Sequence, residues 1–234
     1  MKLRIMGFEE IDFTDQDNTI LIIKNHKFYA HILNLLSSIL YDKNKSTELL
    51  IVDGEKNITT NVLLITDLYR IDFNDKNLLK EIYAQISKNI TSDEEKCMRY
   101  QKLVDDLSTM LEDGLEDYNL EFDYKNDLTI ENYLKAVSLK ISRKAEEKLY
   151  DRLMNYVELV TELVKKPVLV LYNCLDYLDD EELVELIKYK NYKHLHLLFI
   201  ENKSREADSI TFRKYIIDED LCEDYDKIEE VQSD

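Results

Sequence analysis

Short, nearly continuous apolar runs recur along the chain and alternate with segments of helical periodicity. Residues 49–52, 62–65 and 168–172 are such runs, and none is longer than five residues. Runs of this length without polar interruption are typical of strands in a parallel sheet that is covered on both faces. Because these runs alternate with amphipathic segments such as 25–41 and 78–90, the sequence predicts an α/β fold.

Further strands extend this predicted sheet. Residues 2–5 and 11–13 are expected to form a hairpin, and residues 19–24 a buried strand. Residues 194–200 follow a helix that opens at Asp179 or Asp180, and residues 211–217 are expected to form the last, edge strand.

A helical segment interrupts the alternation between the runs at 62 and 168. Ser92 to Glu95 fit a capping box, and Leu103, Leu107, Met110 and Leu111 are expected to face inward on the helix that follows. Apolar residues then recur every three or four positions from 129 to 165, which predicts one helix roughly 50 Å long. We therefore expect a core of residues 1–91 and 166–217, an inserted helical arm at 92–165, and a disordered acidic tail at 218–234.

Glycine is scarce, and this excludes a large class of nucleotide sites. The chain has three glycines, whereas average usage of ~7% would give about sixteen. Neither G-x-G-x-x-G nor G-x-x-x-x-G-K-[ST] occurs, and both motifs need glycine to bring backbone amides close to phosphate. Asp53, Asp67 and Asp176 lie at or just past predicted strand ends, where α/β sheets bind ligands. Without a phosphate loop, we interpret these aspartates as residues that end strands and cap loops.

Other candidate sites are weak. His194 and His196 are expected on one face of a strand, but no third metal ligand lies nearby, so a structural pair is the preferred interpretation. The three cysteines form no C-x-x-C pair. Unbroken apolar stretches are about five residues long, far short of the ~20 that span a bilayer, so we expect a soluble, cytoplasmic protein that does not contact membranes.

The net charge of −18 is concentrated in two segments. Residues 105–131 contain ten acidic residues and one lysine, and residues 218–234 contain nine acidic residues and one lysine. The carboxylates of the first segment are the kind of ligand that hard cations such as Ca²⁺ prefer. A solvated acidic loop without a metal is the alternative interpretation of the same spacing. Directly afterwards, residues 132–152 carry six basic residues against three acidic ones. Such a stripe can neutralise DNA phosphates, or can simply be the solvated face of a helix.

The ordered series of motifs resembles a known family. Residues 49–53 (LLIVD), 62–68 (VLLITDL) and 78–83 (LLKEIY) are followed by 165–183 (KKPVLVLYNCLDYLDDEEL) and 196–201 (HLLFIE). In this order they resemble the ring-forming spacer-acquisition (adaptation) protein family of type II-A CRISPR loci. The resemblance implies a P-loop-NTPase-like sheet core that lacks a phosphate-binding loop, with an inserted long-helix α subdomain.

The same resemblance implies a function in antiviral defence. It implies a homotetrameric ring that binds double-stranded DNA ends without cleaving them and independently of sequence, with Ca²⁺ ordering the arm. The implied partners are the spacer integrase complex and the RNA-guided nuclease of the same locus.

The match to the family's arm joint implies roles for individual residues in metal and DNA binding. The metal ligands implied are Glu116, Glu121, Asp123 and, next after them, Asp127. Lys135 and Lys140 fall on basic positions of the family's following helix and are expected to face DNA, and Arg143, Lys144 and Lys125 are added because they lie close to these positions in sequence. Around 124–126 this chain departs from the family, because relatives carry more acidic residues there.

Two other classes of function stay open from the sequence. One is a non-enzymatic protein-interaction scaffold with a degenerate NTPase-like core, whose long arm docks a partner helix. The other is an enzyme, which no nucleophile or metal motif in the chain favours. Salt-sensitive DNA binding separates the DNA clamp from the scaffold, and a hydrolysis assay tests the enzyme.

Overall fold

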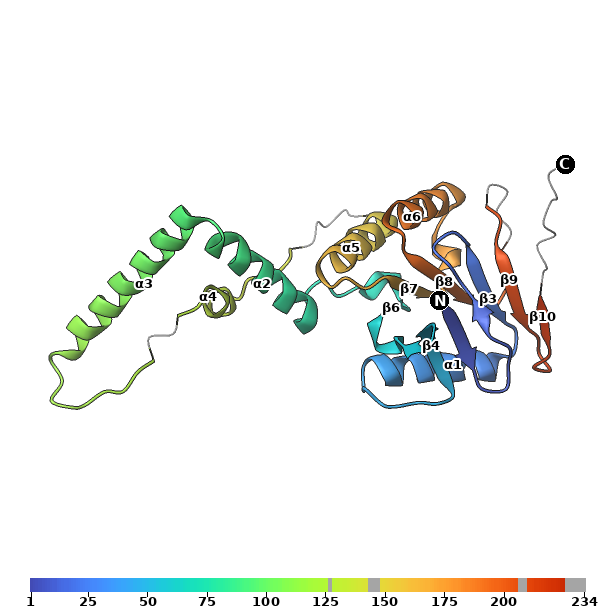
Figure 1. Cartoon of the computed structure of the whole chain (residues 1–234), viewed down its shortest axis with the longest axis horizontal. Coiled ribbons are helices and arrows are strands. Elements are labelled where there is room, and N and C mark those ends of the chain that lie inside the picture. The colour runs from blue at the N-terminus through green and yellow to red at the C-terminus, as the bar shows by residue number, and fades with distance from the viewer. Residues whose placement is uncertain (126–127, 143–147, 206–209, 226–234) are drawn as a thin grey trace. The chain divides into compact units, whose positions relative to one another are not determined.

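Two compact units make up the chain in the computed structural model, Met1–Ile71 with Ala145–Asp234, and Asp72–Lys144. The structure describes residues 1–125, 128–142, 148–205 and 210–225. The first unit is an α/β unit with two sheets, and the second is helical (Figure 1).

A six-stranded sheet forms the centre of the α/β unit, in the order β10-β9-β3-β8-β7-β6. Its five parallel strands are β3 (Thr19–Ile23), β6 (Val62–Ile65), β7 (Val168–Tyr172), β8 (His196–Glu201) and β9 (Arg213–Ile217). Every residue of β3, β6 and β7 is buried, which explains their uninterrupted apolar sequences. The predicted α/β fold with a parallel sheet is confirmed.

The first apolar run belongs to a different sheet. A four-stranded sheet has the order β2-β1-β4-β5, with β1 (Lys2–Ile5), β2 (Ile11–Asp12), β4 (Leu49–Asp53) and β5 (Lys56–Asn57). The hairpin of β1 and β2 is confirmed. The placement of residues 49–52 in the parallel sheet is wrong, because β4 pairs antiparallel with β1. A short apolar run reports burial, and burial alone does not distinguish the two kinds of pairing.

Helices cover both sides of the parallel sheet. In Figure 1, α1 (His26–Leu40) lies on one side of the strands, and α5 (Leu149–Leu163) and α6 (Asp180–Lys193) lie on the other. Short 3₁₀ turns follow three strands: η1 (Thr59–Asn61), η2 (Leu68–Arg70) and η3 (Leu175–Tyr177). The side chains of α1 that pack on the strands are Ile32, Leu36 and Ile39.

The connection from β3 to α1 has no room for a phosphate loop. It consists of Lys24 and Asn25 only. The Asn25 side chain accepts a hydrogen bond from the Phe28 amide at 3.0 Å and donates one to the Glu219 carbonyl at 2.8 Å. A P-loop inserts G-x-x-x-x-G-K-[ST] at such a strand-to-helix connection. The chain geometry therefore agrees with the scarcity of glycine.

The helical unit contains α2 (Lys76–Thr91), α3 (Glu94–Leu115) and α4 (Ile130–Ala136). Its small core consists of Tyr83, Ile130 and Leu134, with partly buried apolar residues of α2 around them. The N-cap of α3 is Asp93, whose side chain accepts from the Lys96 amide at 3.1 Å, so the cap lies one residue after the predicted Ser92.

The predicted single helix over 129–165 is wrong. Helix α4 ends at Ala136, and residues 137–142 are not helical. Ser138 has a positive φ of 53°, and side chains of the same unit replace the lost helical hydrogen bonds. The Tyr83 hydroxyl donates to the Leu139 carbonyl at 2.7 Å, and the Asn74 amide bonds both the N–H and the C=O of Ile141. Tertiary hydrogen bonds thus override the local periodicity.

The acidic segment after residue 217 is partly ordered. Strand β10 (Glu223–Tyr225) pairs antiparallel with β9, so β9 is not the edge strand that the sequence predicted. The Asp218 side chain accepts from the amides of Asp220 and Cys222 at 2.9 and 2.8 Å and shapes the turn between these strands. The prediction of disorder is therefore wrong for residues 218–225, and residues 226–234 lie outside the described part of the chain.

Candidate nucleic-acid interface

The acidic joint follows the end of α3. Glu116 is the C-cap residue of α3, and Glu121 and Asp123 lie in the irregular segment after it, all three exposed to solvent. Asp127, the fourth predicted metal ligand, lies outside the described residues. Across the described ranges, no three His, Cys, Asp or Glu side chains are grouped so that they could hold a metal ion.

Aromatic residues organise the joint in this structure. The Tyr124 hydroxyl donates to Glu112 Oε1 at 2.7 Å, and the Tyr118 and Phe122 rings meet edge-on with centroids 5.7 Å apart. The exposed carboxylates have the chemistry that Ca²⁺ prefers, since Ca²⁺ takes six to eight oxygen ligands. Their positions do not form a ready-made site, so an ion would have to draw them together.

Three of the predicted DNA-binding lysines are exposed to solvent. Lys135 is in the last turn of α4, Lys140 follows that helix, and Lys125 lies at the acidic joint. None of the three forms an ion pair with any other described residue. Arg143 and Lys144 lie outside the described residues.

The basic stripe does not follow one helix. Lys135 and Lys140 belong to the helical unit, whereas Arg152 belongs to α5 of the α/β unit and donates from Nη1 to the Tyr69 carbonyl at 3.1 Å. Arg152 therefore has a structural role, and of the predicted basic stripe the described part of the helical unit keeps Lys135 and Lys140, alongside other exposed cations on α2 and α3 such as Lys80 and Lys102.

Helix α3 presents an apolar face that no other described part of the chain covers. Leu103, Leu107, Met110 and Leu111 are 55%, 54%, 70% and 44% exposed, and α3 has no buried residue. The prediction that these side chains face inward is wrong for the single chain. Contiguous exposed apolar surface on a helix marks an interaction surface.

The three aspartates that followed strands do not form one crevice. Asp53 lies in the small antiparallel sheet. Asp67 is the N-cap of η2 and accepts from the amides of Tyr69 and Arg70, and Asp176 pairs with Lys203 at 2.7 Å. Asp67 and Asp176 therefore cap and fix loops, as the preferred interpretation of the sequence held.

The two histidines of the predicted pair belong to different elements. His194 is the C-cap of α6 in a left-handed conformation and lies 3.2 Å from Asp15, whereas His196 is the first residue of β8. The two imidazoles do not share one strand face, because the strand begins only after His194.

Sequence reasoning missed Glu201 as a candidate. This residue ends β8, is 2% exposed, and accepts hydrogen bonds from the amides of Cys174 and Leu175. Burial raises the pKa of Glu201 to about 7. An acid at the end of a parallel strand was the same signal that singled out Asp67, so the sequence did contain it.

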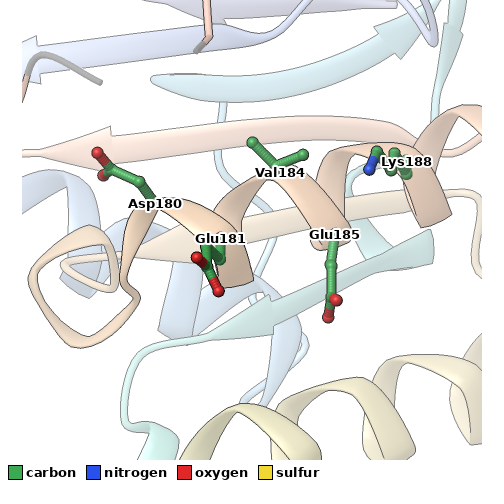
Figure 2. Close-up of a pocket in the computed structure, with 5 residues that line it drawn as sticks. All are labelled: Asp180, Glu181, Val184, Glu185 and Lys188. Carbon is green, nitrogen blue, oxygen red and sulfur yellow. The ribbon is translucent and has the colours of Figure 1, made fainter. Parts of the chain in front are cut away.

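A pocket along α6 has a volume of about 310 Å³, and its described lining residues all belong to that helix. Figure 2 shows Asp180, Glu181, Val184, Glu185 and Lys188 along that helix. Three carboxylates on its lining repel phosphate, so the pocket does not suit DNA or a nucleotide.

The fold and these surfaces define a class: an α/β protein whose parallel sheet has no phosphate loop, joined to a helical unit with separate acidic and basic segments. A model of the family described as CRISPR-associated protein (Cas_Csn2) matches residues 40–221, and the chain belongs to this family. The resemblance to the adaptation-protein family of type II-A CRISPR loci is thereby confirmed.

Individual relatives agree with this membership. The chain is 24% identical over 212 residues to a CRISPR-associated protein Csn2 of Enterococcus faecalis, covering 89% of this chain and 92% of that protein. It is 25% identical over 203 residues to a Csn2 of Streptococcus agalactiae, covering 86% and 88%. The crystal structure of Stu0660 of Streptococcus thermophilus has the same fold, with a TM-score of 0.59 at 14% identity, covering 96% of this chain and 76% of that one.

One further property concerns membranes. Among the residues that the structure describes, no helix is both long enough and apolar enough to cross a bilayer.

Proposed function

We propose that this protein binds the ends of double-stranded DNA during CRISPR spacer acquisition, without catalysis, as a homotetrameric ring assembled with Ca²⁺. The observation that carries the proposal is the separation of charge in the helical unit. Lys135 and Lys140 are exposed, have no ion pair among the described residues, and follow the acidic joint at 116–125 in the sequence. A chain with a net charge of −18 repels DNA unless its cations are segregated and its acids are neutralised.

The DNA contacts would go to phosphates. The ammonium groups of lysine and the guanidinium group of arginine bind phosphate oxygens without reading bases. The residues proposed for these contacts are Lys135, Lys140, Lys125, Arg143 and Lys144. Binding of this kind is independent of sequence and weakens steeply with salt. The missing phosphate loop between β3 and α1 supports a role without nucleotide hydrolysis.

Assembly would use the helical unit. The exposed apolar face of α3 supports self-association, because two copies could cover each other's leucines. Ca²⁺ would draw Glu116, Glu121, Asp123 and Asp127 together and so fix the direction of the chain after α3. The spacer integrase complex and the RNA-guided nuclease of the same locus are the partners proposed for the ring.

Replacing Glu121 and Asp123 by alanine is expected to weaken assembly in Ca²⁺, because two of the proposed ligands are lost. Sedimentation velocity in Ca²⁺ and in chelator measures the oligomer. We expect wild-type tetramer in Ca²⁺ and at least a tenfold rise in the dissociation constant of the variant.

The matched control is Asp42→Ala with Glu55→Ala, which removes the same charge from exposed positions of the α/β unit, away from α3. Unchanged assembly of the Glu121 and Asp123 variant in Ca²⁺ would remove the metal from the proposal. Equal weakening of both variants would assign the effect to net charge.

A protein-interaction scaffold is the second candidate, and the exposed α3 face is the observation that favours it. A scaffold would use this face for a different protein and would show no salt-sensitive binding to DNA.

A further inference from the structure

The loop between β7 and α6 is fastened to the end of β8 by a buried carboxylate. Glu201 is the last residue of β8 and is 2% exposed. Its Oε1 accepts from the Cys174 amide at 2.8 Å and from the Leu175 amide at 3.0 Å. These donors lie at the start of η3, which has no side-chain cap of its own, so Glu201 supplies the missing acceptor.

The residues after Glu201 fasten the same loop further along. Lys203 pairs with Asp176 at 2.7 Å, and Arg205 pairs with Asp180 at 2.6 Å and also donates to the Leu175 carbonyl. On the outer side of this loop, the exposed ring of Tyr177 meets Tyr69 of η2 edge-on at 5.8 Å. The position of Tyr177 therefore depends on how firmly the loop is held.

Glu201 is an unusual residue to bury. Within the described chain it forms no ion pair, because the neighbouring cations Lys203 and Arg205 pair with other carboxylates. Burial of an ionised carboxylate without a cation is unfavourable, and the group responds by holding a proton.

The groups packed around Glu201 determine its pKa. Burial is the main cause that raises the pKa of Glu201 to about 7, Asp176 raises the pKa further, and the two amides and Lys203 lower it. Cys174 and Tyr172 of the β7 end and Tyr29 of α1 are neutral neighbours, since the pKa of each is raised well above neutral pH.

We propose that Glu201 is a proton-operated clamp that holds the β7–α6 loop when protonated and releases it when ionised. The reason is linkage: in the open loop the carboxylate is hydrated and ionises as an ordinary glutamate, so the proton binds more tightly to the closed form. Rising pH therefore favours opening, and with it the separation of Tyr177 from Tyr69. This device lies in the α/β unit and is independent of the DNA and Ca²⁺ sites.

Hydrogen exchange of the full-length protein tests the clamp. The protection factors of the Cys174 and Leu175 amides, corrected for intrinsic exchange, are expected to fall more than tenfold from pH 5.5 to pH 8, and to level off above pH about 7. Glu201→Gln keeps an acceptor without a titratable proton and is expected to show no such fall. A wild-type loop with constant protection, or the same fall in the Gln variant, would overturn the proposal.

A second variant keeps the test decisive if Glu201→Gln does not fold. Asp176→Asn removes a negative charge near Glu201 and leaves the carboxylate itself in place. The pH above which protection levels off is expected to move downward. An unchanged or higher pH would contradict the clamp.

Discussion

Replacing Lys135 and Lys140 by alanine is expected to weaken binding to linear double-stranded DNA by about tenfold to hundredfold at moderate salt. Both side chains are exposed, and neither has an ion pair among the described residues that would be lost with it. Each phosphate that a lysine neutralises contributes about −0.9 to the slope of log K against log salt. The slope is therefore expected to decrease in magnitude by about two for every subunit that contacts DNA.

The matched control replaces Lys45 and Lys56, two exposed lysines of the α/β unit. This variant has the same net charge as the Lys135 and Lys140 variant. A difference in DNA binding between the two therefore reports a local phosphate contact and not a change in the overall electrostatic field of the protein. Fluorescence anisotropy over a salt series measures both. A Lys135 and Lys140 variant that binds like its control would show that these lysines do not face DNA.

Replacing Leu103 and Leu107 by glutamate is expected to abolish assembly of the protein. Full burial of a leucine contributes about 1.5–3 kcal/mol, and placing a charge in the interface adds a desolvation cost. We expect the association constant to fall by at least a hundredfold for each interface. Both side chains are about half exposed in the single chain, so the fold of the chain should persist.

Light scattering after size exclusion measures the mass, and circular dichroism checks the fold. The control is Gln101→Glu with Thr109→Glu, which adds the same charge on the opposite, exposed face of α3. If the leucine variant assembles like the wild type, the apolar face of α3 is not the interface.

The sequence predicted most strands and helices because their burial leaves a periodic pattern. β3, β6, β7 and α1 follow this pattern closely. The periodic pattern gave the wrong prediction where contacts between distant segments determine strand pairing or the end of a helix. The antiparallel pairing of β4 with β1 is not encoded in the run at 49–52, and the break after α4 depends on hydrogen bonds from Tyr83 and Asn74, which lie more than fifty residues earlier.

The candidate site was predictable only in part. Charge segregation is a property of composition, so the acidic joint and the lysines after it were visible in the sequence. The positions of Glu116, Glu121 and Asp123 relative to one another depend on the conformation of an irregular segment, which no periodicity describes. Glu201 carries the same sequence signal as Asp67, an acid at the end of a parallel strand, but its burial is visible only in the structure.

A comparison of linear and covalently closed DNA in a mobility-shift assay, with Ca²⁺ or with chelator, tests the central claim most directly. A ring that threads onto DNA ends should shift linear duplex, should not shift closed circles, and should require Ca²⁺ to assemble. Equal binding to linear and closed DNA would contradict recognition of ends. No binding at low salt under either condition would contradict the DNA function itself and favour the scaffold.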